Sequence, residues 1–196
     1  MALTHLLYLH GFRSSPASAK ALRMAAWAGG QPGLTFACPQ LPPSPLEAMA
    51  LVASIVAGWP SEGSAVIGSS LGGFYATSLA EQHAHRSWRV AVLNPAVDPA
   101  RDLARHIGTL TAWHDPSLQF DFTAQHVAEL AALTPPPRLT HPLRYYALIA
   151  KGDELLDWRE ILARYAGCDG EVLAGSDHGL TDFEDHLPGL AEHLTR

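Results

Sequence analysis

The sequence is poor in the residues that build disulfide-stapled, zinc-binding or nucleic-acid-binding proteins. Cys38 and Cys168 are its only two cysteines and form no CxxC pair, so neither a disulfide framework nor a zinc cluster is indicated. Lysine and arginine number 13 against 19 acidic residues, and a net charge of -6 lacks the basic footprint that nucleic-acid binding requires. The 47% of hydrophobic residues is that of an ordinary globular protein, and mild acidity points to no particular partner.

Long apolar runs are missing as well. The run near the N-terminus, Leu6–Leu9, is far shorter than a membrane span or a signal-peptide core, and no basic segment precedes it. We therefore interpret this run as a buried strand and expect a cytoplasmic protein with no membrane partner, a compartment that also suits free thiols. A length of 196 residues suits one domain, 1–196, and is enough for a sizeable core.

Short β-type runs alternate with helical stretches along the chain, which predicts a mostly parallel sheet with helices on both faces. Strands are expected over residues 5–10, 34–37, 64–68, 89–93, 143–150 and 170–173. Helices are expected over residues 15–28, from residue 44, over residues 70–81 and from residue 181. The sequences at 44–47 and 181–184 predict capping boxes. In the helix from residue 44, the expected sheet-facing positions are Leu46, Met49, Ala50, Ala53 and Val56.

The segment from about residue 96 to residue 141 interrupts this alternation. It contains two weak helical patterns, around residues 100–107 and 123–133, with several aromatic residues between them and three consecutive prolines after them. A long insertion before a late strand could form a small lid over a site. The alternative is one ordinary crossover helix followed by a surface loop.

A G-x-S-x-G sequence, Gly68–Gly72, lies between a predicted strand and a predicted helix, which is the context that a nucleophile elbow requires. In such an elbow the chain turns sharply and holds Ser70 at the tip in a strained conformation, while the glycines let neighbouring backbone approach. A glycine-rich turn at a sheet edge, with the helix N-terminus binding an anion, is the alternative. The elbow predicts the three-layer α/β-hydrolase fold with Ser70 as the nucleophile.

A serine nucleophile needs a base, and in this fold an acid and then a histidine follow the serine along the chain, each after a late strand. Of the eleven histidines, His178 falls in the loop after the last predicted strand, so we expect it to be the base. Asp153 ends the preceding predicted strand, where its carboxylate can reach inward to the imidazole, and is the expected acid. Glu154, Asp157 and Asp177 are nearby alternatives for the acid.

The oxyanion hole of this fold takes one backbone N–H from the residue after the nucleophile and another from an early loop. Leu71 and Phe12 are the corresponding donors. His10, which ends the first predicted strand, is expected to stabilise that loop by hydrogen bonding and to take no part in proton transfer. The candidates for an apolar acyl pocket are Phe12, Phe74, Trp113 and Leu155. Core packing is the alternative for Phe74 and Leu155.

Five segments carry a further pattern, in this order along nearly the whole chain: YLHGFRSSP at 8–16, IGSSLGGFYAT at 67–77, LNPA at 93–96, GDELLD at 152–157 and GSDH at 175–178. Together they resemble the YqiA/YcfP-like family of small bacterial α/β-hydrolase esterases. The resemblance implies a carboxylesterase for short or medium acyl esters, with thioesters as a further substrate class. It also implies Ser70, Asp153 and His178 as the triad. The stretch 113–133 matches no motif of the family.

These features predict a serine esterase that acts on a small acyl ester or thioester through an acyl-enzyme and needs no metal or organic cofactor. Two alternatives use the same fold. A closed or blocked site would make the protein a catalytically silent binding module. The same triad could instead cleave amides or carry out perhydrolysis, and substrate profiling separates these reactions.

Overall fold

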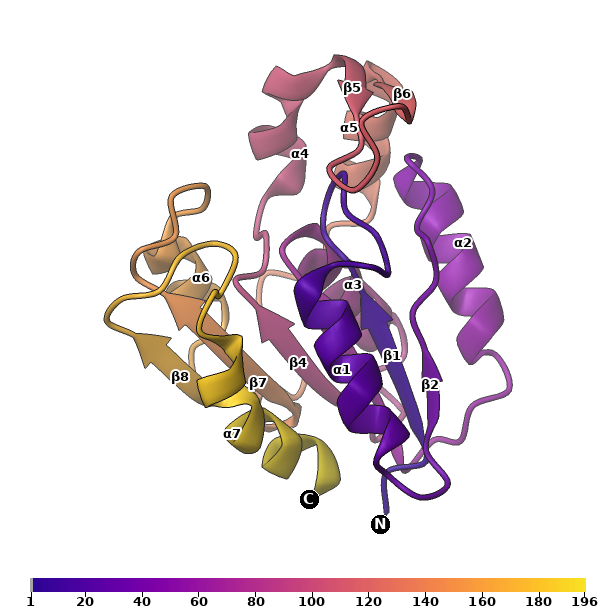
Figure 1. Cartoon of the computed structure of the whole chain (residues 1–196), viewed down its shortest axis with the longest axis vertical. Coiled ribbons are helices and arrows are strands. Elements are labelled where there is room, and N and C mark those ends of the chain that lie inside the picture. The colour runs from indigo at the N-terminus through magenta and orange to yellow at the C-terminus, as the bar shows by residue number, and fades with distance from the viewer. Residues whose placement is uncertain (1) are drawn as a thin grey trace.

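A computed structural model describes residues 2–196, and its centre is a parallel sheet of six strands in the order β2-β1-β3-β4-β7-β8 (Figure 1). The strands are β1 (His5–Leu9), β2 (Thr35–Ala37), β3 (Ser64–Ser69), β4 (Arg89–Leu93), β7 (Tyr145–Ala150) and β8 (Asp169–Leu173). The register brings the ends of the central strands together, because Leu9 lies opposite Gly68 and Ser69 lies opposite Leu93. The predicted α/β architecture is confirmed.

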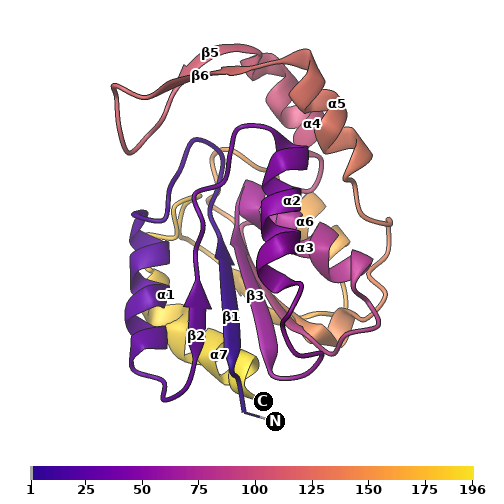
Figure 2. The ribbon, with the colours of Figure 1, turned by 90° about the vertical axis from the view of Figure 1, so that its right-hand side faces the viewer.

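Helices cover both faces of this sheet (Figure 2). The helices on the faces are α1 (Ala19–Gly29), α2 (Pro45–Val56), α3 (Leu71–Gln82), α6 (Trp158–Arg164) and α7 (Phe183–Thr195). Along β1, Leu6 and Tyr8 pack with α1 and α7, whereas Leu7 and Leu9 pack with α2, α3 and α6. A strand buried on both sides needs an unbroken apolar run, which explains the sequence of β1. Within residues 2–196, no helix is both long and apolar enough to cross a membrane.

Helix α2 begins where the sequence predicts, but it buries a different face. Pro45 is its first residue, and the Ser44 hydroxyl accepts the Glu47 N–H at 3.2 Å. The buried positions are Pro45, Ala48, Met49, Val52 and Val56, whereas Leu46, Ala50 and Ala53 are exposed. The expected face was therefore wrong at three of five positions. Nearly every residue of this helix is apolar, so the sequence period does not define which side faces the sheet.

Two predicted helix starts are also wrong. Helix α1 begins at Ala19, because residues 15–18 form a turn in which the Ser15 carbonyl accepts the Ser18 N–H at 3.1 Å. Helix α7 begins at Phe183, and no side chain caps it, so the predicted capping box at 181–184 does not form. The Thr181 N–H instead donates to the Asp177 carboxylate at 3.0 Å, which closes the preceding loop on itself.

The segment 96–141 lies over the carboxyl ends of the strands (Figure 2). It consists of α4 (Pro99–Leu103), a 3-10 turn (Ala104–His106), β5 (Gly108–Thr111), β6 (Gln119–Phe122) and α5 (Ala124–Ala132). The two weak helical patterns correspond to α4 with its 3-10 turn and to α5. The antiparallel β5–β6 hairpin was not predicted, because its strands are only four residues each, too short for the polar–apolar alternation of β6 to stand out in the sequence.

Glu129 of α5 ties this segment to the N-terminus of α2. Its side chain is buried, and its carboxylate accepts hydrogen bonds from the Ser44 hydroxyl at 2.7 Å and from the Leu46 N–H at 3.3 Å. Burial acts to raise the pKa of the Glu129 carboxyl, but these hydrogen bonds and one from Gln125 outweigh it and hold the pKa below its ordinary value. The carboxylate also faces a helix N-terminus, where an anion is favoured.

We expect Glu129→Ala to lower the free energy of unfolding by about 2 kcal/mol, because it leaves the donors of Ser44 and Leu46 without their acceptor. Amide hydrogens of residues 108–132 should exchange faster, since α5 loses its anchor. Urea denaturation and hydrogen-exchange mass spectrometry measure the two effects. Glu47→Ala, an exposed position in the first turn of α2, is the matched control and should cost less than about 1 kcal/mol. Unchanged exchange in Glu129→Ala would show that α5 is held by other contacts.

Candidate active site

Ser70 stands at the turn from β3 into α3 in a strained backbone conformation, with φ of 56° and ψ of -121°. Its N–H donates to the Leu93 carbonyl of β4 at 3.0 Å, which fixes the turn against the neighbouring strand. The turn needs its glycines. A Cβ atom on Gly68 would lie 2.1 Å from the Gly72 carbonyl oxygen, and one on Gly72 would lie 2.0 Å from the Leu9 carbonyl oxygen. The geometry is that of the predicted nucleophile elbow.

His178 and Asp153 complete a hydrogen-bonded chain that starts at Ser70. The Nε2 atom of His178 lies 3.0 Å from the Ser70 Oγ, and its Nδ1 atom lies 2.7 Å from the Asp153 Oδ2. The Asp153 side chain is fully buried, and its other oxygen accepts the N–H groups of Leu155 and Leu156, each at 2.9 Å. The carboxylate is therefore held rigidly behind the imidazole, an arrangement in which a histidine can take the serine proton.

The three alternative acids have other partners. Glu154 accepts the backbone N–H of His178 at 3.0 Å and so positions the histidine loop, whereas the imidazole ring is bonded by Asp153. Asp157 accepts the Arg159 N–H at 2.9 Å and caps α6. Asp177 accepts the Thr181 N–H. Among the acids that the sequence offered, Asp153 is the one whose carboxylate reaches the imidazole.

Asn94 is a buried residue of this site that the sequence analysis did not assign. It follows β4 with φ of 41°, and its amide nitrogen donates to the carbonyls of Asp177 at 2.9 Å and His178 at 3.3 Å. Its amide oxygen accepts the Ala150 N–H at 2.8 Å, at the end of the strand that leads to Asp153. Asn94 thus joins the acid loop to the histidine loop. The sequence did contain one signal for a special backbone position here, an Asn-Pro pair directly after an apolar strand. Asparagine tolerates a positive φ better than most residues do.

The early loop of residues 10–14 lies directly against Ser70. A Cβ atom on Gly11 would come within 3.2 Å of the Ser70 Cβ. The backbone N–H groups of Phe12 and Leu71 donate no hydrogen bond to any of residues 2–196, and both residues border the same cavity as Ser70. Two free donors beside a nucleophile suit the negative oxygen of a tetrahedral intermediate.

His10 holds this loop through both of its ring nitrogens. Its Nε2 atom accepts the Leu41 N–H at 3.0 Å, so the proton of the neutral ring resides on Nδ1, which donates to the Gly11 carbonyl at 3.0 Å. In a trans peptide the C=O and N–H point in opposite directions. Fixing the Gly11 carbonyl therefore also fixes the direction of the Phe12 N–H. Burial, the largest cause, lowers the pKa of His10 below its ordinary value of 6.5 and keeps the ring neutral.

The stability of the protein should fall as the pH drops below about 6.5, because the unfolded chain then takes up a proton that folded His10 resists. In His10→Ala this part of the pH dependence should disappear. The variant should also be less stable by about 1–3 kcal/mol near neutral pH, since the buried Leu41 N–H loses its acceptor. Urea denaturation at about pH 7.5 and about pH 5.5 measures both effects. An equal loss of stability on acidification in both proteins would assign the pH dependence to other groups.

A cavity of about 1020 Å³ opens onto Ser70 and His178. Three of the four candidate pocket residues, Phe12, Trp113 and Leu155, border it, and Trp113 and Leu155 are more than half exposed, at 71% and 58%. Phe74 does not border it. Its side chain is 1% exposed and packs in the core against Tyr75. Phe74 is therefore a core residue, which was the alternative to a place in the acyl pocket.

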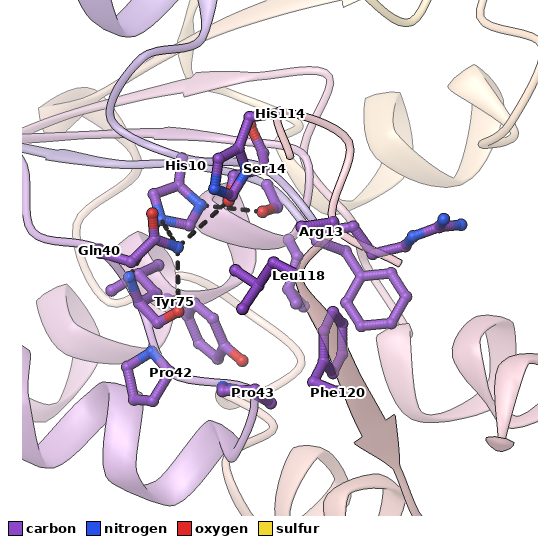
Figure 3. Close-up of a pocket in the computed structure, with 15 residues that line it drawn as sticks. His10, Arg13, Ser14, Gln40, Pro42, Pro43, Tyr75, His114, Leu118 and Phe120 are labelled. Carbon is purple, nitrogen blue, oxygen red and sulfur yellow. Dashed lines mark hydrogen bonds between the residues drawn. The ribbon is translucent and has the colours of Figure 1, made fainter. Parts of the chain in front are cut away.

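A second cavity of about 340 Å³ lies beyond the early loop (Figure 3). It shares Gly11–Ser14 and Leu71 with the larger cavity but is not bordered by His178. Most of its other walls are apolar side chains, namely Leu41, Pro42, Pro43, Ala112, Leu118 and Phe120. Within residues 2–196, no group of three or more histidine, cysteine, aspartate or glutamate side chains is placed to hold a metal ion.

Comparison with solved structures identifies the fold. Mouse alpha/beta hydrolase domain-containing protein 10 is similar with a TM-score of 0.71 at 16% identity, over 97% of this chain and 90% of that one. Est1E from Butyrivibrio proteoclasticus has a TM-score of 0.69 at 16% identity, over 98% of this chain and 86% of that one. The monoacylglycerol lipase of Paleococcus ferrophilus has a TM-score of 0.66 at 17% identity, over 96% of this chain and 94% of that one.

The chain therefore has the α/β-hydrolase fold, as the nucleophile elbow predicts. More narrowly, the model of the family described as Uncharacterised protein family (UPF0227) matches residues 5–195, and the chain belongs to this family. The match confirms the family resemblance carried by the sequence motifs.

Proposed function

We propose that this protein is a serine esterase that hydrolyses short- to medium-chain acyl esters, or thioesters, through an acyl-enzyme. The observation that carries the proposal is the hydrogen-bonded chain from Ser70 Oγ through His178 to the buried Asp153, at 3.0 Å and 2.7 Å. It faces an open cavity that is also bordered by Phe12 and Leu71, whose backbone N–H groups have no acceptor among residues 2–196. A nucleophile, a base, an orienting acid and oxyanion donors are the parts that acyl transfer needs.

In the proposed reaction, Ser70 Oγ forms a bond to the carbonyl carbon while its proton moves to His178 Nε2. The N–H groups of Phe12 and Leu71 hold the negative oxygen, and the N-terminus of α3 adds a favourable dipole. When the intermediate collapses, the bond to the alcohol or thiol breaks and His178 protonates the leaving group. Water then repeats the sequence on the acyl-enzyme and releases the carboxylic acid.

The larger cavity suits the leaving group, because it includes His178, which must protonate that group. Asp153 stabilises the imidazolium that forms in each half-reaction and stays ionised itself. At about 1020 Å³ the cavity is wide enough for a sizeable alcohol or thiol.

The test is to treat the purified protein with a fluorophosphonate probe, to locate the modified residue by tandem mass spectrometry, and to assay 4-nitrophenyl acetate, butyrate and octanoate. We expect the probe to modify a single serine, Ser70. We also expect the untreated protein to hydrolyse the esters and the probe-treated protein to have lost this activity. Heat-denatured protein is the control for non-enzymatic labelling. A protein that neither reacts with the probe nor hydrolyses any of the esters would be a binding module on a hydrolase fold. Labelling at another serine would overturn the assignment of Ser70.

A further inference from the structure

The hydroxyl of Tyr75 makes no hydrogen bond to any of residues 2–196, and its oxygen reaches the solvent of a cavity although the residue as a whole is only 3% exposed. It points into the second cavity, into the space that Pro43, Leu118 and Phe120 line (Figure 3). The other buried tyrosine hydroxyls of the same layer are satisfied: Tyr145 donates to Glu81 at 2.7 Å, and Tyr165 lies 2.7 Å from the Thr77 hydroxyl. Water in the cavity can complete the Tyr75 hydroxyl, so a ligand that displaces this water must supply a hydrogen bond in its place or lose affinity.

The position of the second cavity relative to the proposed reaction centre identifies which part of an ester would enter it. The leaving group must lie next to His178, and the carbonyl oxygen must lie between the N–H groups of Phe12 and Leu71. The acyl chain then extends on the remaining side of the carbonyl carbon, away from His178. The second cavity is bordered by Phe12 and Leu71 but by neither Ser70 nor His178, so an acyl chain that starts at Ser70 would pass the two N–H groups and place its far end there.

Helix α3 carries both Leu71, whose N–H is a proposed oxyanion donor, and Tyr75. Tyr75 follows Leu71 by four residues, so the two lie on one face of the helix about 6 Å apart along its axis. Burial, to which the charge of Glu129 adds, raises the pKa of the Tyr75 hydroxyl far above its ordinary value, so it remains a neutral donor and acceptor. A cavity of about 150 Å³ holds one benzene ring, so 340 Å³ has room for roughly a dozen non-hydrogen atoms.

We propose that the second cavity binds the acyl group of the ester, and that Tyr75 selects acyl groups carrying a hydroxyl or carbonyl oxygen at their far end. This inference rests on the proposed esterase activity and adds its substrate class: esters of hydroxylated or oxo acids, with the aromatic hydroxy acids included by the apolar walls. Tyr75 is a specificity-determining residue, because its hydrogen bond forms with one kind of acyl group and is left unmade with the other.

The test uses two esters with the same leaving group, so that the His178 side of the site stays constant. They are the 4-nitrophenyl esters of 3-(4-hydroxyphenyl)propanoic acid and of 3-phenylpropanoic acid. In the wild-type protein we expect kcat/KM to be about 10-fold higher for the hydroxylated ester, the range that one hydrogen bond supplies. In Tyr75→Phe this ratio should fall to about 1 or below. Tyr146→Phe removes a hydroxyl that bonds Glu171 outside both cavities, and it should keep the wild-type ratio.

Each outcome has one meaning. A wild-type ratio near 1, with both esters hydrolysed, would overturn the substrate assignment while leaving the esterase proposal standing. A high ratio that survives in Tyr75→Phe would assign the selection to another group and overturn the role of Tyr75. If the wild-type protein hydrolyses neither of the two esters nor 4-nitrophenyl acetate, the esterase proposal fails, and the proposed acyl subsite fails with it. Circular dichroism of each variant verifies that the fold is retained.

Discussion

Ser70→Ala should lower kcat for 4-nitrophenyl butyrate by about 10⁵- to 10⁶-fold, the largest effect that we expect from any single substitution. The variant removes the atom that bonds to the carbonyl carbon. It leaves the imidazole, the buried carboxylate and the free N–H groups in place. Substrate binding should therefore change little, and a slow residual hydrolysis above the rate in buffer should remain from the oxyanion donors. Steady-state kinetics at high protein concentration measures the residual rate, and the fluorophosphonate probe should no longer label the protein.

Ser69→Ala is the matched control for this experiment. Ser69 is the last residue of β3, precedes Ser70 and also borders the larger cavity, but its side chain makes no hydrogen bond to His178. We expect its kcat/KM to lie within about 10-fold of the wild-type value. If Ser69→Ala lowered kcat as much as Ser70→Ala, the loss of activity would come from a distorted turn between β3 and α3 and not from the missing hydroxyl of Ser70. If Ser70→Ala retained most of the activity, acyl transfer through Ser70 would be excluded.

The geometry around Ser70 could be predicted from the sequence because it depends on short-range requirements. Gly68 and Gly72 are needed where backbone atoms approach to about 2 Å of a hypothetical Cβ, and such positions exclude every other residue. His178 and Asp153 could be placed because parallel strands bring their carboxyl ends to one edge of the sheet. The order of the residues along the chain then indicated which loops meet there.

Other parts of the site depend on contacts that no local pattern reveals. Asn94 bonds to backbone groups of two loops that lie more than 50 residues away in the sequence, so its role becomes visible only when those loops are in place. Tyr75 follows Phe74 on α3, and the period of the helix does not tell which aromatic side chain faces a cavity and which faces the core. The buried Glu129 likewise becomes an anchor only through its contact with Ser44.

The second large effect that we expect is on kcat, from a substitution of Asp153. Asp153→Asn should lower kcat by about 10⁴-fold, with KM nearly unchanged, because the substitution reverses the tautomer of His178. One oxygen of Asp153 already accepts the N–H groups of Leu155 and Leu156, each at 2.9 Å. An asparagine must keep its own oxygen there, which turns its NH₂ group toward His178 Nδ1. Nδ1 then becomes an acceptor, Nε2 carries the proton, and the ring can no longer take the proton of Ser70.

Two matched variants separate this explanation from general damage to the loop. Asp157→Asn alters the cap of α6 a few residues away and should keep kcat within about 2-fold, because its carboxylate bonds only local backbone and Arg159. Glu154→Gln retains an oxygen that can accept the His178 N–H, and it should lower kcat by less than about 10-fold. A loss in Glu154→Gln as deep as in Asp153→Asn would mean that rigid placement of the histidine loop limits the rate. A loss confined to Asp153→Asn would mean that the rate depends on which imidazole nitrogen carries the proton.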